Sequence, residues 1–125
     1  MDDDRTILAA LEALADAFNA HDIDRIMGFF AEDCTLDMPR GPEPHGTRYT
    51  GREAVRRGLM TRFETTPDVH YGEAEHLACG STGVSRWLLT GTTPAGEAVR
   101  VRGCDFYGFR DGKVVRKDSY WKIVT

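Results

Sequence analysis

Apolar residues in the first half of the chain recur at the spacing of amphipathic helices. Within residues 4–20, Ile7, Leu11, Leu14 and Phe18 follow one another at steps of four, three and four. This spacing places them on one face, because an α-helix has about 3.6 residues per turn. The pattern therefore predicts a first helix over residues 4–20 with a single apolar face.

A second helix is predicted from Asp22, whose carboxylate can accept from free backbone N–H groups at a helix start. The apolar residues that follow keep helical spacing as far as Glu32 and Asp33, where this helix is expected to end. A short strand should come next, with the acidic Asp37 between two apolar residues.

A third helix is predicted to begin at Thr50, after a loop over residues 39–49 that is rich in proline and glycine. The stretch Thr50-Gly51-Arg52-Glu53 resembles a capping box, in which the threonine accepts from the helix start and the glutamate reaches back. Apolar residues at helical spacing continue to Phe63.

Beyond Val69 the chain changes to a strand pattern, rich in Val, Thr, Tyr, Phe and Trp and interrupted by turn signals such as Asp111-Gly112. The predicted strands cover residues 69–79, 84–92, 98–110 and 113–124. A strand as long as 98–110 must curl, and Gly103 and Gly108 are its expected bend points.

These elements predict an α+β fold, in which a curved antiparallel sheet is packed by three N-terminal helices. We expect a cone with an internal cavity between the sheet and the helices. The length of 125 residues suits one core, so residues 1–125 are assigned to a single domain.

Composition narrows the function classes. Hydrophobic residues make up 41% and charged residues 29% of the chain, which argues against disorder. The net charge of −4 disfavours nucleic acid as a partner, because a phosphate-binding face is basic. No apolar run approaches the ~20 residues that a membrane span requires, and the acidic start MDDDR is no secretory signal, so we expect a cytoplasmic protein. The cysteines, which lie far apart at Cys34, Cys79 and Cys104, indicate neither disulfides nor a zinc site.

Strand alternation sorts the candidate side chains. Over 98–110, Asp105 shares a face with Tyr107, whereas Cys104 and Phe106 share the other face. In strand 84–92 the same rule places Arg86 opposite to Trp87.

The order of elements and two stretches of sequence resemble the nuclear transport factor two-like superfamily. The stretches are LADAFNAHDIDRIMGFFAEDCTLDMPRG near the N-terminus and CDFYGFRDGKVVRKDSYW near the C-terminus. This superfamily includes ketosteroid isomerases, limonene epoxide hydrolases, SnoaL-like polyketide cyclases and many non-catalytic modules. The resemblance covers nearly the whole chain and implies a cystatin-like cone of the SnoaL-like or ketosteroid isomerase-like kind.

The resemblance to ketosteroid isomerases directs attention to two aspartates. Asp37 matches the position of their general base, and Asp105 matches an oxyanion-hole acid that apolar surroundings keep protonated. Removal of a proton beside a carbonyl needs such a base and such a donor. The tyrosine on the first helix of the isomerases corresponds to Leu14 here, and Tyr49 or Tyr107 is a candidate replacement.

Limonene epoxide hydrolases offer a second comparison, since they use an Arg-x-Asp on a middle strand together with a later aspartate. Arg86 matches their arginine and Asp118 matches the later aspartate, but Leu88 stands at the middle aspartate. The comparison implies an ion pair between Arg86 and Asp118 that points into the cone.

SnoaL-like cyclases need only one carboxylate as acid/base in an otherwise apolar pocket, which this sequence satisfies. Further titratable candidates are His21, His45, His70 and His76. Aromatic residues expected to line the substrate site are Phe18, Tyr49, Trp87, Tyr107 and Tyr120. Trp87 and Trp121 could equally fill the core or an interface.

The preferred hypothesis is a cofactor-free enzyme that transfers protons on a small apolar carbonyl compound. Asp37 would be the base and Asp105 the donor, with Asp118 and Arg86 in support and no metal. A homodimer is expected through the sheet face that carries Phe106, which would otherwise expose apolar residues.

The alternative hypothesis is a non-catalytic ligand-binding or dimerisation module of the same fold. A deep pocket with two converging carboxyls would favour the enzyme. A filled cone, with those acids in salt bridges, would favour the module.

Overall fold

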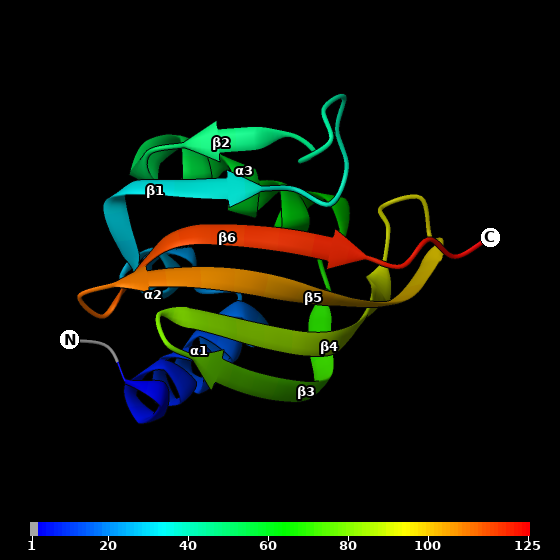
Figure 1. Cartoon of the computed structure of the whole chain (residues 1–125). Coiled ribbons are helices and arrows are strands. Elements are labelled where there is room, and N and C mark those ends of the chain that lie inside the picture. The colour runs from blue at the N-terminus through cyan, green and yellow to red at the C-terminus, as the bar shows by residue number, and fades with distance from the viewer. Residues whose placement is uncertain (1–2) are drawn as a thin grey trace.

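Six strands form one curved sheet, and the helices pack on one of its faces in this computed structural model, which describes residues 3–125 (Figure 1). The helices are α1 (Asp4–Asn19), α2 (Ile23–Met27) and α3 (Arg52–Thr65). The strands are β1 (Phe30–Asp37), β2 (Arg48–Thr50), β3 (His70–Cys79), β4 (Thr82–Thr92), β5 (Ala98–Arg110) and β6 (Lys113–Trp121). Their order across the sheet is β2-β1-β6-β5-β4-β3. The predicted α+β class with N-terminal helices on a curved sheet is therefore confirmed.

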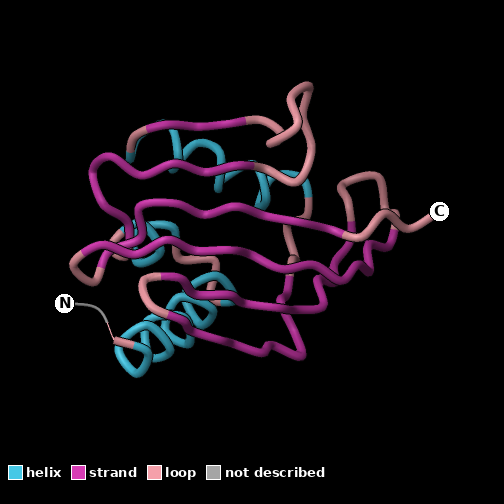
Figure 2. Tube along the Cα trace, in the orientation of Figure 1, coloured by secondary structure: helices cyan, strands magenta, loops and turns pink. Residues whose placement is uncertain are grey.

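The pairing of strands differs from the expectation at one position. Neighbouring strands run antiparallel except β1 and β6, which are parallel. This pair joins the N-terminal part of the sheet to the C-terminal strand, with Leu36 beside Lys117 and Asp37 beside Asp118. Figure 2 shows the strands side by side, with the β1–β2 loop, the β4–β5 turn and the C-terminus at the same end.

Helix α1 forms where the apolar spacing predicted it. Asp3 caps it, because its carboxylate accepts from the Thr6 backbone N–H at 2.8 Å. Ile7, Leu11 and Leu14 on its apolar face are each at most 1% exposed.

The second helix is much shorter than predicted. It ends at Met27, with Gly28 as its C-cap, and Phe30 already begins β1. The apolar residues after Met27 are compatible with a helix or with a buried strand. Pairing with β6 favours the strand, because the Val114 backbone N–H donates to the Phe29 carbonyl at 2.8 Å. The expected helix end at Glu32 and Asp33 is wrong.

The predicted capping box at the start of α3 is also wrong. Gly51 is the N-cap, with φ 88°, and no side chain caps this end. Thr50 is instead the last residue of β2, where it pairs with Thr35 of β1. A positive φ at this point favours glycine, which adopts it without strain.

The strands β3 to β6 follow the predicted pattern closely, although β6 ends at Trp121 rather than at residue 124. The register between β5 and β6 shifts at Gly108 and Phe109, which confirms one of the two expected bend points. Between Gly72 and Glu75 the register of β3 shifts as well, a bulge that the sequence analysis did not predict.

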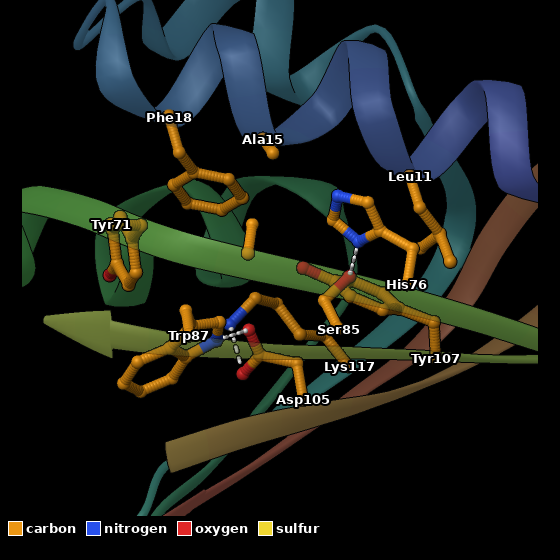
Figure 3. Close-up of a pocket in the computed structure, with 11 residues that line it drawn as sticks. Leu11, Ala15, Phe18, Tyr71, His76, Ser85, Trp87, Asp105, Tyr107 and Lys117 are labelled. Atoms are coloured by element: carbon orange, nitrogen blue, oxygen red, sulfur yellow. Dashed lines mark hydrogen bonds and ion pairs between the residues drawn. The ribbon is translucent and has the colours of Figure 1, made fainter. Parts of the chain in front are cut away.

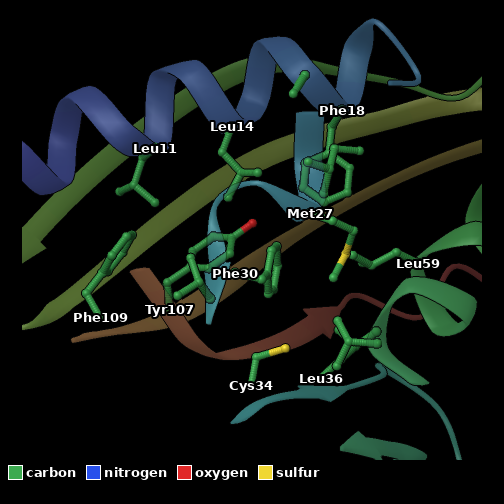
Figure 4. Close-up of a cluster of buried hydrophobic side chains, with 14 of the residues drawn as sticks. Leu11, Leu14, Phe18, Met27, Phe30, Cys34, Leu36, Leu59, Tyr107 and Phe109 are labelled. Carbon is green, nitrogen blue, oxygen red and sulfur yellow. The ribbon is translucent and has the colours of Figure 1, made fainter. Parts of the chain in front are cut away.

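The core lies between the sheet and the helices (Figure 4). One large cluster joins the apolar face of α1 to Phe30, Leu36, Leu59 and Phe109. A smaller cluster beside it contains Val69, Trp87, Leu89 and Val101. No helix in residues 3–125 has the length and apolar character to cross a membrane.

Gly103 is the position where β5 tolerates no side chain. A Cβ there would lie 2.4 Å from the Tyr120 carbonyl oxygen and 2.5 Å from the Trp87 ring. We predict that Gly103→Ala lowers the free energy of unfolding by about 1–3 kcal/mol, because backbone and indole must both shift. Gly108→Ala in the same strand is the control, since its Cβ would make only ordinary contacts at 3.6 Å.

Urea denaturation of both variants tests this prediction. The Gly108 variant should stay within about 0.5 kcal/mol of the original protein. Equal stability of the two variants would show that β5 and Trp87 adapt without strain.

Candidate functional site

A charged cluster is buried in the apolar interior of the fold (Figure 3). Asp105 is 4% and Lys117 is 6% exposed. The Lys117 ammonium donates to Asp105 Oδ1 at 3.0 Å and to Ser119 Oγ at 2.9 Å. Ser119 Oγ in turn donates to Asp105 Oδ1 at 2.5 Å, and Trp87 Nε1 donates to Asp105 Oδ2 at 2.9 Å.

Three adjacent strands bring this cluster together. Asp105 pairs with Ser119 across β5 and β6, and Tyr107 pairs with Lys117. Because side chains of paired residues share a face, all four point to the inner side of the sheet. The alternation that placed Asp105 with Tyr107 on one face of β5 is thus confirmed.

The contacts of Asp105 define the role that it can have. All three of its partners are donors, so Asp105 accepts hydrogen bonds through both oxygens, as a carboxylate does. These contacts do not suit the expected role of Asp105 as a hydrogen-bond donor. The donor to an oxygen atom of a ligand would have to be another group.

Lys117 is the group that can donate. An ammonium carries three N–H bonds, and Asp105 and Ser119 accept two of them. The ammonium also lies 5.4 Å from the centre of the Phe18 ring and 5.8 Å from that of Tyr107. A lysine held in this way can present its remaining N–H to a ligand inside the cavity.

Aromatic rings form a continuous wall around the cluster. Ring centroids of Phe18 and Tyr71 are 5.8 Å apart, those of Tyr71 and Trp87 5.1 Å, and those of Trp87 and Trp121 6.1 Å. Burial raises the pKa of the Tyr71 and Tyr107 hydroxyls well above the ordinary tyrosine value. Both tyrosines therefore stay neutral over the physiological pH range.

His76 lies on the same inner face, next to Ser85. Its Nδ1 is 2.8 Å from Ser85 Oγ. Burial lowers the pKa of the imidazole, although Glu12 and Asp16 act in the opposite direction. His76 is thus a neutral hydrogen-bonding group in the wall, opposite to α1 (Figure 3).

The cavity around these groups is small. One lobe of about 30 Å³ lies under α1, beside His76, and a second lobe of about 20 Å³ lies nearer to α3. Phe18, Tyr71, Trp87, Asp105 and Lys117 line both lobes. Each lobe has room for a water molecule or two, so a larger ligand requires side chains to move.

Asp37 does not point into this cavity. It pairs with Asp118 in the register between β1 and β6, whereas its neighbour Leu36 pairs with Lys117 and lines the inner lobe. Its carboxylate binds Arg48 through two hydrogen bonds, Nε to Oδ1 at 2.7 Å and Nη2 to Oδ2 at 3.0 Å. The expectation that Asp37 faces the cone is wrong, because alternation gives the inner face to the apolar residues beside it.

Arg86 and Asp118 also lie on the outer face of the sheet. The Arg86 guanidinium pairs with Glu75, and both side chains are 62% exposed. Asp118 accepts from the Tyr120 hydroxyl at 3.2 Å. The expected inward pair of Arg86 and Asp118 is therefore wrong.

Of the five aromatic residues expected at the substrate site, three line the inner cavity, namely Phe18, Trp87 and Tyr107. Tyr120 lies beside a groove on the outer face, and Tyr49 lies beside a groove at the mouth of the cone.

Sequence reasoning missed Lys117 and Ser119. The stretch VVRKDSY resembles a solvent-exposed strand. Because Arg116, Lys117 and Asp118 are all charged, the sequence shows no alternation of polar and apolar residues there. Counting back from the hairpin at Asp111-Gly112 without a bulge would set Tyr107 opposite Arg116 and Asp105 opposite Asp118. The register shift at Gly108 and Phe109 instead sets Tyr107 opposite Lys117 and Asp105 opposite Ser119, so the hairpin signal alone could not have found them. Within residues 3–125, no group of three or more His, Cys, Asp or Glu side chains is placed to hold a metal ion.

Comparison with known families agrees with this architecture. Residues 11–117, most of the chain, match the SnoaL-like domain. The chain belongs to the SnoaL-like domain family. No curated protein sequence is similar enough to this SnoaL-like domain to count as a relative.

Solved structures share the fold of this SnoaL-like domain. A proposed polyketide cyclase from Xanthomonas campestris pv. campestris is 23% identical, with 94% of this chain and 91% of that one covered at a TM-score of 0.84. An NTF2-like protein of unknown function from Mesorhizobium loti is 26% identical, with coverages of 98% and 97% and a TM-score of 0.79. TerC, crystallised with polyporic acid, is 18% identical, with coverages of 94% and 92% and a TM-score of 0.78.

The buried ion pair generates a stability prediction. Lys117→Met leaves the Asp105 carboxylate without its cation, so the free energy of unfolding should fall by about 3–5 kcal/mol. Adding Asp105→Leu removes the uncompensated charge and should recover much of the loss. Arg86→Met is the matched control, because it breaks an exposed ion pair and should change stability by less than about 1 kcal/mol.

Urea denaturation of the three variants measures these differences. If Lys117→Met and Arg86→Met have the same small effect, the interior ion pair is open to solvent.

Proposed function

We propose that this SnoaL-like domain is a cofactor-free enzyme that transfers a proton beside the carbonyl group of a small apolar molecule. Asp105 is the base, and Lys117 is the donor to the carbonyl oxygen. The observation that carries the proposal is the ion pair of these residues in the wall of an apolar cavity, with hydrogen-bonding capacity left on both partners.

The step is a simple proton transfer. Asp105 Oδ2, which accepts only from Trp87, takes the proton from the carbon next to the carbonyl. The electron pair of the broken C–H bond moves into the enolate, and the free N–H of Lys117 stabilises the developing charge on oxygen. The neutral Asp105 then returns the proton to carbon, or delivers it to the alkoxide formed when the enolate attacks a second carbonyl of the same molecule.

This assignment selects among the mechanisms of the superfamily. Asp37 faces away from the cavity, so the two-carboxylate arrangement of the isomerases is not available. Arg86 and Asp118 lie on the outer face, so the arrangement of the epoxide hydrolases is not available either. One carboxylate in an apolar pocket remains, which is what SnoaL-like cyclases need, and a proposed polyketide cyclase has the same fold.

The energetic argument supports a functional role for the ion pair. Apolar residues of similar volume in place of a buried ion pair often stabilise a protein by about 1–4 kcal/mol. Stability alone therefore gives little reason to place Lys117 and Asp105 in this interior, whereas a base and a donor at one cavity give a chemical reason.

A non-catalytic ligand-binding module is the second candidate. The filled cone and the engagement of both Asp37 and Asp105 in ion pairs favour it. The two candidates differ in whether the side chains of the cluster change a bond of the ligand.

Deuterium exchange tests the enzymatic proposal. Cyclohexanone and phenylacetone in deuterium oxide should exchange their α-protons faster with the protein than in buffer alone, as followed by proton NMR. Asp105→Asn should lower the protein-dependent rate by about a hundredfold or more, because it removes the base. Asp37→Asn is the matched control on the outer face and should keep the rate.

The double variant Asp105→Leu with Lys117→Met guards against loss of folding, since it is expected to be folded and must be inactive. Exchange at the original rate in this variant would contradict the proposal. Absence of protein-dependent exchange with every ketone would favour the binding module.

We also propose that the outer face of the sheet pairs with a second copy of the chain. Phe106 and Tyr120 are 40% and 54% exposed there, with ring centroids 5.7 Å apart. Light scattering at micromolar concentration should give twice the mass of one chain, and Phe106→Glu should shift it toward the monomer. A monomeric mass for the original protein would contradict this proposal.

A further inference from the structure

The cone has a mouth where the β1–β2 loop, the β4–β5 turn and the end of β6 meet. A groove of about 420 Å³ lies there. It shares Met38, Pro39, Arg62 and Trp121 with the inner lobe of the cavity. The groove and the lobe are therefore adjacent, and these four side chains separate the solvent from Asp105 and Lys117.

Arg62 is the charged residue at this boundary. Its guanidinium stacks over the Trp121 ring, 4.4 Å from the ring centre. Its hydrogen bond to Thr65 is a long one, 3.5 Å from Nη1 to Oγ1. The guanidinium also acts on the Tyr71 hydroxyl, whose pKa it lowers against the larger effect of burial. Within residues 3–125 no acidic side chain forms an ion pair with it.

The charges that line this path do not balance. The residues of the groove include Arg40 and Arg62, and none of those described there is acidic. In the inner lobe of the cavity, the positive charge of Lys117 is balanced by Asp105, so the positive charge of Arg62 remains unbalanced. The whole chain has a net charge of −4, so a cationic path contrasts with the rest of the protein. A positive charge beside a poorly hydrated cavity attracts an anion more strongly than one in open water.

The polar groups of the groove suit one kind of anion. A guanidinium stacked on an indole keeps the N–H bonds in its plane free, and this fork matches a carboxylate. Hydroxyl groups that can donate to the same anion line the groove at Thr47, Thr66 and Thr93, whereas the Thr65 hydroxyl donates to the Thr61 carbonyl at 2.8 Å. Just inside, Trp121, Trp87 and Tyr71 offer aromatic surface to an apolar body.

We propose that the mouth binds the carboxylate of an amphipathic organic acid, with Arg62 as the residue that selects the anion. The apolar body of the acid enters between the aromatic rings toward Lys117. The groove residues shared with the inner lobe move apart to admit it. Arg62 is thus a specificity residue at the opening, distinct from the Asp105–Lys117 pair at the base of the cavity.

This inference rests on the proposed function only in requiring that a small molecule enters the cone. It does not require that the molecule reacts. A substrate of the proposed enzyme would then be a keto acid or a related acid, with its carbonyl near Lys117 and its carboxylate near Arg62.

Binding of acids and their amides tests the inference. Phenylpropanoate and cyclohexylacetate are compared with phenylpropanamide and cyclohexylacetamide, which have the same shape and no charge. The two tryptophans of the chain, Trp87 and Trp121, both line the inner lobe, so their fluorescence reports on binding. Calorimetry gives the dissociation constants independently.

The original protein should bind each acid about tenfold more tightly than its amide, or better, because a hydrogen bond to a charged group contributes at least about that factor. Arg62→Gln should bring the two affinities together, and Arg62→Lys should keep part of the preference. Arg57→Gln is the control on the same helix, since Arg57 is 66% exposed and pairs with Glu53 away from the mouth. It should keep the full preference.

Equal binding of acid and amide by the original protein overturns the inference, as does a preference that survives in Arg62→Gln. Failure of all four probes to bind at millimolar concentration overturns it too. An acid preference without deuterium exchange on any ketone would retain the anion site and reject the enzyme. Exchange without an acid preference would retain the enzyme and reject the anion site.

Discussion

The ion pair between Asp105 and Lys117 sets the character of the interior. Two charged side chains are held in an apolar cone, where each unpaired charge would be costly. Ser119 and Trp87 complete the hydrogen bonding of the carboxylate. Gly103 makes this possible, because the Trp87 ring lies over the space that a side chain there would occupy. The absence of a side chain at Gly103 thus leaves room for the Trp87 indole that donates to Asp105.

The ion pairs Arg86–Glu75 and Arg102–Glu73 on the outer face of the sheet are exposed to water, whereas the Asp105–Lys117 pair on the inner face is buried. Water screens the two outer pairs. On the inner face, one ion pair is shielded by aromatic rings and by α1. A charge of the same size therefore has a larger electrostatic effect inside the cone than on the outer face of the sheet.

Filling of the cone links structure to the proposed reaction. Cavity lobes of about 30 and 20 Å³ have room for a water molecule or two and not for a substrate, so a ligand must separate side chains at the mouth. Exclusion of water from the closed cavity would strengthen the interaction between Lys117 and a developing enolate. The same exclusion suits a binding module, and only a reaction distinguishes the two.

Much of the fold could be predicted from the sequence, because it depends on local signals. The spacing of Ile7, Leu11 and Leu14 determined α1, and Asp111-Gly112 determined the last hairpin. Alternation within one strand placed Asp105 and Tyr107 on the same face. The short second helix could not be predicted, since its apolar residues suit either structure until Val114 pairs with the chain at Phe29.

The candidate site depended on pairing between strands that are distant in sequence. Asp37 looked like a cavity acid until its parallel pairing with Asp118 set it on the outer face beside Arg48. The sequence suggested that Lys117 faces solvent, whereas in the structure its ammonium lies beside the rings of Phe18 and Tyr107. Periodicity along the chain was enough to predict α1 and the long strands β3 to β6, because periodicity is a local property of the backbone. Only the tertiary structure decided which faces enclose the cavity, because strand register and curvature arise from contacts between strands.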